Sequence, residues 1–436
     1  MLTFENRVVV ITGAARGLGL EHARYFASRK AKLFLNDVDK ENGVNLIDAV
    51  AESIRKQYGV EVATDNNSVE EGHKIIENAV NVFKRIDVLV NNAGQLIDRG
   101  MSKITQQDFD NIIRVHLKGA FRCTLAAWPY FRKQKYGRII NTSSAAGLFG
   151  NFGQTAYSSA KAGILGMTMA LAKEGENLNI KVNAIAPLAD TRMTQGVIPD
   201  DLIVSIPAKL VSPLVTLLAH EECPENGQIF EIGGGWIAKL RWERTEGGNF
   251  PLTFTPEMLK ENWEKVTDFS RKCDYSTSGS DSIERMFNNF EFQTKGKQPE
   301  PQNEGVVDSK TIYRLMKVYV EEGKADKAIK KCNSIYQFVI TENESENIAF
   351  QFWVSVKPEN QSAGEGVHKS PDATFTISNK HFFDVCIGKL NPQVAFTKKM
   401  MKIKGNFKKA TAFTPDLFPQ PTKENVEKYL KGKAQL

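Results

Sequence analysis

A β-branched run that opens directly into a glycine-rich turn constrains the fold more than any other feature. Residues 7–12, RVVVIT, are typical of a strand that is buried on both faces. The turn that follows carries Gly13, Gly17 and Gly19 and leads into a helical pattern that extends to Phe26. Small residues here let the backbone approach a pyrophosphate, whose charge is met by the helix N-terminus. The segment predicts a dinucleotide-binding unit, although such a turn alone is a weak signal.

Strands and helices alternate along roughly the first 235 residues. Strands are expected at 32–36, near 62, at 87–90, 138–140 and 181–185, with a last strand at 228–232, and helices at 40–56, 69–83 and 107–133. This alternation predicts an α/β domain with a Rossmann-like, doubly wound parallel sheet, whose ligand lies at the carboxyl ends of the strands. Five residues are expected at those ends: Gly13, Asp37, Asn67, Asn91 and Ser144.

An acidic residue ends the second expected strand, about twenty residues after the glycines. There the Asp37 side chain can bond both ribose hydroxyls and repel a 2′-phosphate. Arg16, inside the glycine turn, is the contrary signal, since a cation there can meet that phosphate. The balance favours NAD over NADP.

A tyrosine and a lysine at i and i+4, Tyr157 and Lys161, share one face of an expected helix. A phenol titrates near pH ~10, so it is a poor base at neutral pH unless a fixed positive charge stabilises the phenolate. Lys161 can supply that charge, and the Ser144 hydroxyl can hold a substrate oxygen beside Tyr157. The segment predicts a proton-transfer site. The alternative is an ordinary pair of surface neighbours.

The order and spacing of these motifs resemble the short-chain dehydrogenase/reductase family. The matching residues are Thr12-Gly13-x3-Gly17-x-Gly19, Asn91-Asn92-Ala93-Gly94, Ser144, Tyr157-x3-Lys161 and Asn183-x3-Pro187. The resemblance implies that Tyr157 is the general acid/base, that Lys161 holds the nicotinamide ribose and lowers the tyrosine pKa, and that Ser144 binds the substrate oxygen. It implies cofactor contacts from Gly13, Arg16, Gly17, Leu18, Gly19, Asp37, Asn67, Ser68, Asn91, Ala93, Gly94, Tyr157, Lys161, Pro187, Ala189 and Thr191.

One position departs from the usual family pattern. His116 stands where the family usually has Asn. A histidine can still hold the water that relays protons from Lys161, but its ionisation would add pH dependence.

Further stretches resemble one group of that family, the dehydrogenase part of the type 2 peroxisomal multifunctional enzymes. The stretches are RVHL at 114–117, KYGRII at 135–140, GNFGQ at 150–154, RMTQ at 192–195 and KLRWERT at 239–245. The resemblance implies NAD-dependent oxidation of (3R)-hydroxyacyl-CoA in fatty acid β-oxidation. Two departures are the missing glycine-rich insertion after Asp37 and Asn67 at the adenine position, where Asp is common.

A different pattern begins near residue 305. Helices at 310–319, 326–331 and 379–387 and strands at 334–341, 347–356 and 373–377 predict a smaller α+β domain. DATFTIS at 372–378, GKLNPQVAF at 388–396 and MKIKGN at 401–406 resemble the sterol-carrier-protein type 2 domain, which implies an apolar tunnel for acyl chains, acyl-CoA or sterols. Phe382, Phe396, Met400 and Met401 are expected either to line it or to be plain core, and Gln393 to meet a polar head group. The lysines of 398–409 suit CoA phosphates, an anionic surface or a solvated face.

The predicted domains account for about the whole chain. They are a dehydrogenase domain at 1–245, a helical appendage at 246–292 that packs on it, a linker or long ordered loop at 293–304, and the lipid-binding domain at 305–436. No room remains for a hydratase domain, so we expect a separate protein to hydrate 2-enoyl-CoA.

Composition excludes several classes of protein. The apolar runs are far shorter than the ~18 residues that a membrane helix requires, and the N-terminus lacks a secretory pattern. The five cysteines are scattered with no metal spacing, which favours free thiols in a reducing compartment and no metal site. A net charge of +6 requires no nucleic-acid partner.

The last three residues, Ala434-Gln435-Leu436, resemble the C-terminal tripeptide that addresses proteins to peroxisomes. Gln435 replaces the usual basic residue, and Lys431 and Lys433 are placed to compensate. The tripeptide predicts a peroxisomal import receptor as a partner.

Three functions are compatible with the sequence. The favoured one is an acyl-CoA-chain dehydrogenase with a tethered lipid-binding module, which the family implies to be a homodimer paired through the helices bearing His116 and Tyr157. The second is a hydroxysteroid dehydrogenase. The third is a lipid-transfer protein whose dehydrogenase half is inert; nothing in lipid transfer needs the set Ser144, Tyr157 and Lys161.

Overall fold

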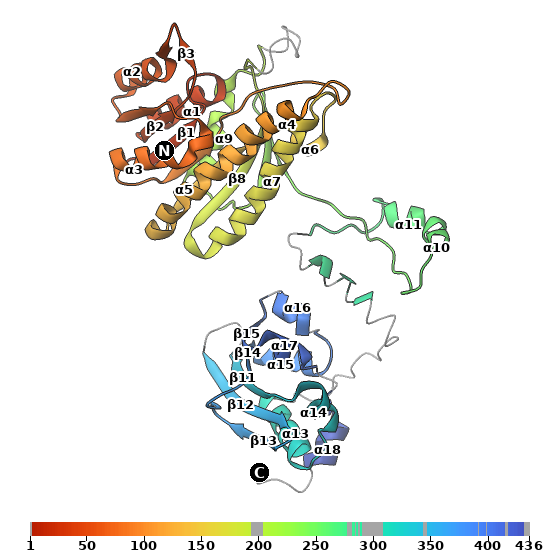
Figure 1. Ribbon diagram of the computed structural model, residues 1–436. Coiled ribbons are helices and arrows are strands. Elements are labelled where there is room, and N and C mark those ends of the chain that lie inside the picture. Colours follow the sequence, from red (N-terminus) through yellow and green to blue (C-terminus); the bar gives the residue numbers. More distant parts are fainter. Residues whose placement is uncertain are drawn as a thin grey trace. The chain divides into compact units, whose positions relative to one another are not determined.

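In the computed structural model, the chain folds into two compact units, residues 1–241 and 242–436 (Figure 1). It describes residues 2–192, 204–276, 281–283, 285–286, 288–289, 308–342, 347–390, 392–397, 399–414 and 417–430. The first unit ends close to the predicted boundary at 245. The packing of 246–292 on the dehydrogenase domain and the linker at 293–304 stay predictions.

The first unit is built on an eight-stranded sheet in the order β10-β9-β8-β7-β6-β1-β2-β5. Its strands are β1 (Val8–Thr12), β2 (Lys32–Asn36), β5 (Val62–Asp65), β6 (Val88–Asn91), β7 (Gly137–Thr142), β8 (Ile180–Leu188), β9 (Ile229–Gly233) and β10 (Trp236–Leu240). All neighbours pair in parallel except β9 and β10. The doubly wound parallel sheet is therefore confirmed.

Helices cover both faces of this sheet (Figure 1). On one face, α1 (Gly17–Ser28), α2 (Leu46–Tyr58) and α9 (Ser212–Ala219) bury Phe26, Ala51 and Leu218 in one apolar cluster. On the other, α3 (Gly72–Phe83) and α5 (Gly119–Gln134) bury a second cluster. The described part of the unit also contains the α-helices α4 (Gln106–Ile113), α6 (Ala145–Phe149) and α7 (Thr155–Gly175).

Three sequence expectations in this unit were wrong in detail. The expected last strand at 228–232 is followed by β10, because Gly234 and Gly235 both adopt positive φ and reverse the chain. The helix expected from residue 40 begins at Leu46, because Asn42 and Gly43, also at positive φ, form the turn of the hairpin β3 (Lys40–Glu41) and β4 (Val44–Asn45). The long helix expected at 107–133 is interrupted by a π-helical turn at Arg114–Lys118.

The second unit contains a five-stranded sheet in the order β13-β12-β11-β14-β15. Its strands are β11 (Ile335–Thr341), β12 (Ile348–Lys357), β13 (Asn360–Glu365), β14 (Ala373–Ser378) and β15 (Met401–Gly405). Helices with defined bounds in the described part of this unit are α10 (Pro256–Glu261), α11 (Trp263–Thr267), α13 (Ser309–Glu321), α14 (Asp326–Cys332), α15 (Asn379–Cys386), α16 (Pro392–Thr397), α17 (Phe407–Ala412) and α18 (Lys423–Leu430). The predicted α+β arrangement is confirmed, with β13 as an additional strand.

Aromatic rings dominate the core of this second unit. Phe338 stacks on Phe352 at 4.7 Å and on Phe375 at 5.3 Å between ring centroids. Phe382 and Phe413 pack against the same Phe338 ring. Large rings on three adjacent strands thus form one apolar interior.

Two absences concern only the part of the chain that the structure describes. No helix there is long and apolar enough to cross a membrane. No group of His, Cys, Asp and Glu side chains there is arranged to hold a metal ion, and all five cysteines are free thiols.

Candidate active site

The glycine turn after β1 is folded so closely that side chains are excluded. Gly13 adopts φ +66°, and a Cβ there would lie 2.8 Å from Cα of Ala93. A Cβ on Gly19 would collide with the carbonyl oxygen of Gly13. Gly17 adopts φ +51°, with Thr191 beside it. The glycines therefore let the turn pack directly against the end of β6 and against the first turn of α1.

Two residues hold this turn against the end of β6, and neither was assigned a role from the sequence. The Thr12 hydroxyl accepts hydrogen bonds from the amides of Asn92 and Ala93, both at 3.1 Å. The Asn92 side-chain amide donates to the carbonyl oxygens of Thr12 at 3.1 Å and Gly13 at 3.0 Å. Thr12 and Asn92 both belong to the family motifs quoted from the sequence, so those motifs could have identified them. The bonds fix the cradle from behind.

Asp37 lies just beyond β2 with its carboxylate fixed by the backbone. One oxygen accepts from the amide of Ala15 at 2.8 Å, and the other accepts from the amide of Asp39 at 2.9 Å. The carboxylate thereby lies beside the glycine turn. Arg16 reaches Asp39 at 3.5 Å and Glu41 at 3.8 Å, so acidic groups face the cation that was the contrary signal for NADP.

A buried carboxylate that the sequence reasoning missed organises the expected adenine side. Asp65, at the end of β5, accepts bonds from the side chains of Asn36 and Asn78 and from both the amide and the side chain of Asn67, at 2.8 to 2.9 Å. Because Asn67 donates to Asp65, its side-chain oxygen remains an acceptor. An acceptor is what an Asp at this position would also present. The neighbouring Ser68 hydroxyl caps the turn at Val69–Glu71 by accepting from the amide of Glu70.

The remaining residues predicted to contact the cofactor differ in whether the side chain or only the backbone faces a ligand. Asn91 turns its side chain inward, where it donates to Asn141 at 2.9 Å and Thr124 at 3.1 Å, so only its backbone is available to a ligand. Leu18 packs on the core, Pro187 lies within β8 and Ala189 is buried just after it.

Tyr157 and Lys161 both lie on α7, one turn apart. Lys161 is buried, and its Nζ donates to the carbonyl oxygen of Thr142 at 2.7 Å. The same Nζ lies 5.5 Å from the centre of the Tyr157 ring. Burial lowers the pKa of Lys161 to about 7. Lys161 is buried and Tyr157 is half-buried, so the two are not an exposed surface pair.

The phenol of Tyr157 does not have the lowered pKa that the family resemblance implied. Burial raises the pKa of Tyr157, and Asp98 adds to the increase. A hydrogen bond with the Ser144 side chain acts in the opposite direction on that pKa. Ser144 also caps α6 by accepting from the amide of Ala146 at 3.2 Å. The structure thus brings Ser144 and Tyr157 together but leaves the phenol protonated at neutral pH.

The π-helical turn carries His116 into the same cluster. Its ring meets the Tyr157 ring edge-on at 5.3 Å between centroids. Its Nε2 lies 2.6 Å from the carbonyl oxygen and 3.0 Å from the amide of Gln95, while its buried Nδ1 has no hydrogen-bond partner among the described residues. Gly94 leaves room for the ring, since a Cβ there would collide with it.

The expected pH dependence from His116 is contradicted by this environment. Burial and, to a smaller extent, the charge of Lys161 together lower the pKa of His116 to about 3, against a smaller opposing effect of the hydrogen bond with Gln95. The imidazole is therefore neutral throughout the physiological range.

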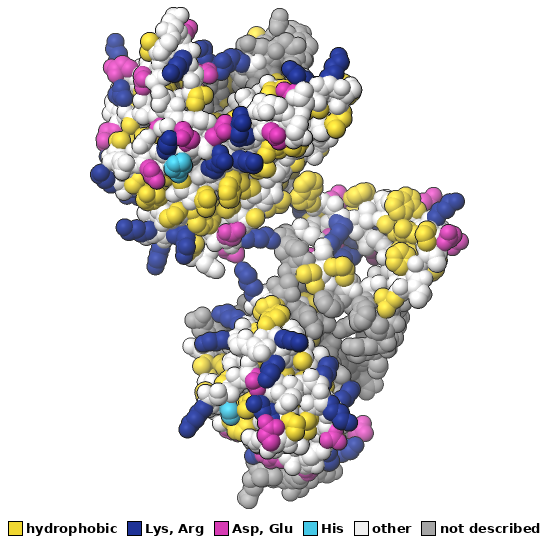
Figure 2. Space-filling view, in the orientation of Figure 1, with side chains coloured by type: hydrophobic (Ala, Val, Ile, Leu, Met, Phe, Trp, Pro, Cys, Tyr) yellow, Lys and Arg dark blue, Asp and Glu magenta, His cyan; other side chains and the backbone are white. Residues whose placement is uncertain are grey.

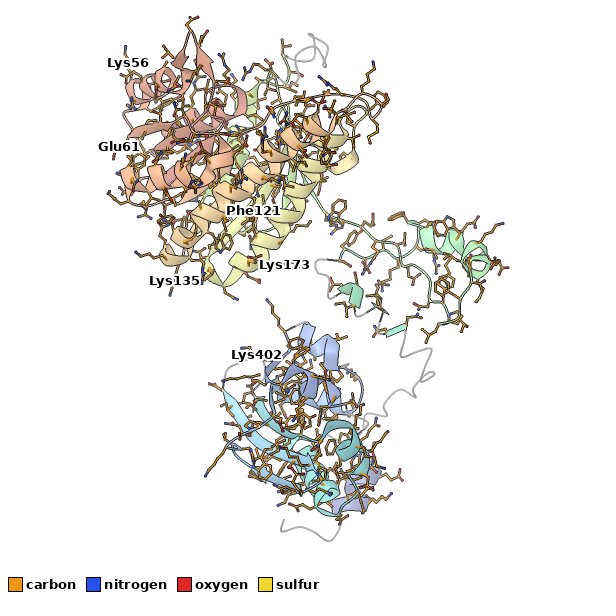
Figure 3. The ribbon with its side chains drawn as sticks, in the orientation of Figure 1. Lys56, Glu61, Phe121, Lys135, Lys173 and Lys402 are labelled. Carbon is orange, nitrogen blue, oxygen red and sulfur yellow. The ribbon has the colours of Figure 1, made fainter. Side chains whose placement is uncertain are left out.

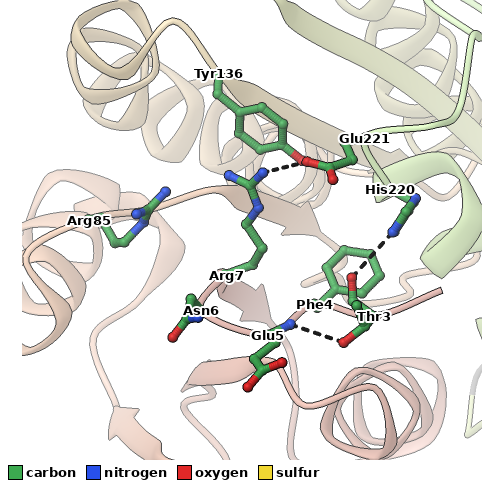
Figure 4. A pocket seen from close by; sticks show the side chains of 9 residues that line it. All are labelled: Thr3, Phe4, Glu5, Asn6, Arg7, Arg85, Tyr136, His220 and Glu221. Atoms are coloured by element: carbon green, nitrogen blue, oxygen red, sulfur yellow. Dashed lines mark hydrogen bonds and ion pairs between the residues drawn. The ribbon is translucent and has the colours of Figure 1, made fainter.

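A cavity of about 290 Å³ lies at the opposite, amino-terminal edge of the sheet (Figure 4). Arg7, from the start of β1, crosses it between Asp87 and Glu221. Its guanidinium also stacks on the ring of Tyr136 at 4.1 Å. Asp87 also pairs with Arg85, so two guanidinium groups share the carboxylates of Asp87 and Glu221 at this cavity.

The predicted lipid-contacting residues do not share one environment. Phe382 and Met401 are buried in the aromatic core, 3% and 6% exposed. Phe396 and Met400 lie at the surface, 37% and 36% exposed. The backbone of Gln393 lies in α16, but its side chain is outside the described residues, as are 431–436 with the expected targeting tripeptide.

Two family models match the chain. Residues 7–201 match the short chain dehydrogenase model, and residues 314–417 match the SCP-2 sterol transfer family. The two matches correspond to the two folded units.

Relatives with known names share both regions or the first alone. Peroxisomal multifunctional enzyme A of Dictyostelium discoideum is 36% identical over 94% of this chain and 97% of its own length. Peroxisomal multifunctional enzyme type 2 of Mus musculus is 50% identical over 62% of this chain, which spans only 38% of that longer protein. The full-length type 2 enzyme structure from Drosophila melanogaster superposes with a TM-score of 0.59 at 31% identity, over 81% of this chain and 67% of that one. The chain therefore belongs to the short chain dehydrogenase family, in the group whose relatives are named peroxisomal multifunctional enzymes, and it carries an SCP-2 sterol transfer domain.

Proposed function

We propose that the protein oxidises (3R)-3-hydroxyacyl-CoA to 3-ketoacyl-CoA with NAD, in peroxisomal fatty acid β-oxidation. One observation carries the proposal: Ser144, Tyr157, Lys161 and His116 gather beside the glycine turn, where the parallel strands end. The names of the mouse, Dictyostelium and Drosophila relatives support the assignment.

The residues around the glycine turn fit NAD. The glycine turn leads directly into the N-terminus of α1, which suits a pyrophosphate, and Asp37 is fixed beside the turn, where an acidic group disfavours a 2′-phosphate. Asn67, oriented by Asp65, presents an acceptor for the adenine amino group. When bound, the nicotinamide accepts the hydride from the substrate.

Tyr157 is the proton acceptor in this proposal. In its ionised form its phenolate oxygen takes the proton of the substrate 3-hydroxyl and becomes a phenol again, and the Ser144 hydroxyl donates to the substrate oxygen as it becomes a carbonyl. Because burial raises the pKa of Tyr157, the phenolate requires a nearby cation, and Lys161 supplies it in its protonated form, which prevails below its own pKa of about 7. His116 contributes as a neutral ring whose Nδ1 can hold a water on the route of the proton from Lys161.

Tyr157→Phe tests this function directly. Removing the hydroxyl should lower turnover of a (3R)-3-hydroxyacyl-CoA by at least about a hundredfold, the usual contribution of general acid/base catalysis. NAD affinity, measured by fluorescence titration, should hardly change. Tyr58→Phe, at the end of α2, is the matched control. Substantial residual dehydrogenase activity in the Tyr157 variant would exclude this assignment.

Hydroxysteroid oxidation is the second candidate, because the same chemistry acts on a secondary alcohol and a sterol-transfer domain is attached. Turnover of a 17β-hydroxysteroid should be compared with that of a 3R-hydroxyacyl-CoA on one preparation. A higher kcat/KM for the steroid would favour this candidate. A pure lipid-transfer protein would instead transfer lipid but reduce no NAD with either substrate.

We further propose a homodimer that pairs through α5 and α7. Phe121 and Leu125 on α5 are 49% and 59% exposed, and Phe121 lies at the surface of the first unit (Figure 3). Apolar exposure of this kind on one helix face is typical of a protein interface. Phe121→Asp should yield monomers in sedimentation velocity, and an unchanged dimer would place the interface elsewhere.

Import into peroxisomes and a separate 2-enoyl-CoA hydratase complete the proposal. The relatives' names support the location. A reporter bearing the last dozen residues should localise to peroxisomes, and diffuse cytosolic signal would count against it.

A further inference from the structure

The segment between β6 and α4, residues 92–105, reaches the Tyr157 cluster at two points. At one point, the backbone of Gln95 holds the His116 ring through Nε2. At the other, Ile97 packs with Tyr157 in a small apolar cluster that includes residues of α4 and α7. Because the rings of His116 and Tyr157 meet edge-on, this segment contacts both members of one ring pair.

Two hydrogen bonds fasten the same segment to the start of α7. The Gln154 side-chain amide donates to a carboxylate oxygen of Asp98 at 2.9 Å, and the Arg99 amide donates to the carbonyl oxygen of Gly153 at 2.9 Å. Gln154 lies immediately before α7, one turn before the phenol. The Asn151 side chain donates to the Gln154 side-chain oxygen at 3.1 Å, which turns the amide nitrogen of Gln154 toward Asp98.

Asp98 brings a charge to this contact that no cation offsets. The neighbouring Arg99 pairs with Asp108 at 2.9 Å, whereas Asp98 has no ion-pair partner among the residues that the structure describes. Figure 2 shows acidic side chains interspersed with lysines and arginines on the visible face of the first unit. Burial raises the pKa of Tyr157 most, and the charge of Asp98 adds to the increase, because a negative charge opposes ionisation of a phenol.

Few other ionisable groups face Tyr157 in the described part of the chain. Lys161 lies one turn along α7, and His116, from the π-helical turn, is neutral. The side chains that α4 contributes to the cluster are apolar, and the Ser144 hydroxyl is uncharged. Asp98 is therefore the negative charge that acts on the phenol within the described structure.

We propose that Asp98 is a positioning residue for the reaction, which clamps residues 95–99 to the start of α7 and sets a negative charge beside the phenol. The clamp fixes the Tyr157 ring against His116, and the charge makes ionisation of the phenol depend on the Lys161 cation. A contact that only stabilised the loop would not need a charge, since an asparagine oxygen accepts the same bond. The proposal rests on the proposed function, because Asp98 acts through Tyr157.

The first test needs no substrate. Asp98→Asn removes the charge but keeps an acceptor for Gln154. Nuclear magnetic resonance of the full chain with isotope-labelled tyrosine follows the ionisation of Tyr157, whose signal is the one missing from Tyr157→Phe. The titration midpoint should lie at lower pH in Asp98→Asn than in the unaltered protein. Added salt should reduce the difference, because Asp98 is exposed and its charge is screened.

Asp110→Asn is the matched control. Asp110 is also exposed, and its carboxylate also accepts from a glutamine side chain, that of Gln106, at 3.0 Å on α4. This variant should titrate like the unaltered protein. An unmoved midpoint in Asp98→Asn, or an equal displacement in Asp110→Asn, would overturn the role of the charge.

The second test separates the charge from the clamp by kinetics. With a (3R)-3-hydroxyacyl-CoA, Asp98→Asn should raise kcat/KM about threefold on the acidic limb at low salt, because the phenolate is the base. Asp98→Ala should show the same rise but a several-fold lower kcat on the plateau, because the bond to Gln154 is lost as well. Thermal melting checks that both variants are folded.

Two kinetic results would overturn the proposal. Equal plateau kcat in the Asn and Ala variants would show that the bond to Gln154 positions nothing. An unmoved acidic limb in both variants would show that the charge of Asp98 does not act on the catalytic base. If the protein turned over no hydroxyacyl-CoA while the resonance midpoint still moved, the proposed function would fail and the effect of Asp98 on Tyr157 would stand.

Discussion

The two units bury different kinds of side chain. Around Tyr157, the first unit buries polar and ionisable groups and fixes them with hydrogen bonds, as in the bond from Lys161 to Thr142. Around Phe338, the second unit buries stacked rings. Proton transfer requires groups held at defined positions, whereas holding an apolar ligand requires an interior that can repack. Mutations in the two interiors should therefore have different consequences.

The largest expected effect on stability is in the aromatic core. Phe338→Ala removes a ring that contacts Phe352, Phe375, Phe382 and Phe413, and should cost about 3 to 5 kcal/mol of folding free energy in the second unit. Urea unfolding followed by two probes, one for each unit, would measure it. Turnover by the first unit should remain. If the substitution destabilised both units equally, the two units would not unfold independently, and this prediction would be wrong.

The next effect concerns the buried lysine. Burial lowers the pKa of Lys161 to about 7, whereas an unfolded lysine titrates near ~10.4. Between these values the unfolded chain holds a proton that the folded protein has released, so the stability of the cofactor-free protein rises with pH, by at most about 1.4 kcal/mol per pH unit. Lys161→Met should flatten this dependence in urea unfolding across that range. Equal slopes in both proteins would show that Lys161 is not deprotonated there.

Cofactor preference should change by a smaller amount. Asp37→Asn keeps the shape of the side chain but removes the charge that disfavours a 2′-phosphate. NAD should bind about tenfold to a hundredfold more weakly, the usual effect of losing bonds to a charged group, and the preference over NADP should fall. Asp110→Asn, the same change at an exposed position on α4, is the control. An unchanged ratio of the two affinities in the Asp37 variant would exclude Asp37 as the discriminating residue.

The smallest expected effect is at His116. Because burial lowers its pKa to about 3, His116→Asn should leave the pH dependence of kcat/KM unchanged between about pH 5 and 8. A shift of the acidic limb of the kcat/KM profile to a different pH in the variant would show that the imidazole ionises during catalysis.

Strong local patterns predicted most of the fold. The run that forms β1 and the segments that form β2 and β14 are rich in β-branched and large apolar residues, and each was located closely. β13 was missed because Asn360–Glu365 contains no β-branched or aromatic residue, so its pairing with β12 decides its conformation. The hairpin at Asn42 and Gly43 was missed although that dipeptide is a strong turn signal.

The site was predictable in its membership but not in its electrostatics. Spacing identified Ser144, Tyr157 and Lys161, because motif order is visible in the chain. Burial is a property of the folded structure, and it is burial that neutralises His116 and raises the pKa of Tyr157. The role of Asp65 depends on asparagines from three separate segments, which no local pattern connects.

The central claim is that the Tyr157 cluster oxidises one stereoisomer of a 3-hydroxyacyl-CoA. NAD reduction should be measured side by side with the 3R and 3S substrates, for the unaltered protein and for Tyr157→Phe. We predict rapid reduction with the 3R substrate alone, and its loss in the variant. Equal or faster reduction with the 3S substrate, or a variant as active as the unaltered protein, would contradict this account.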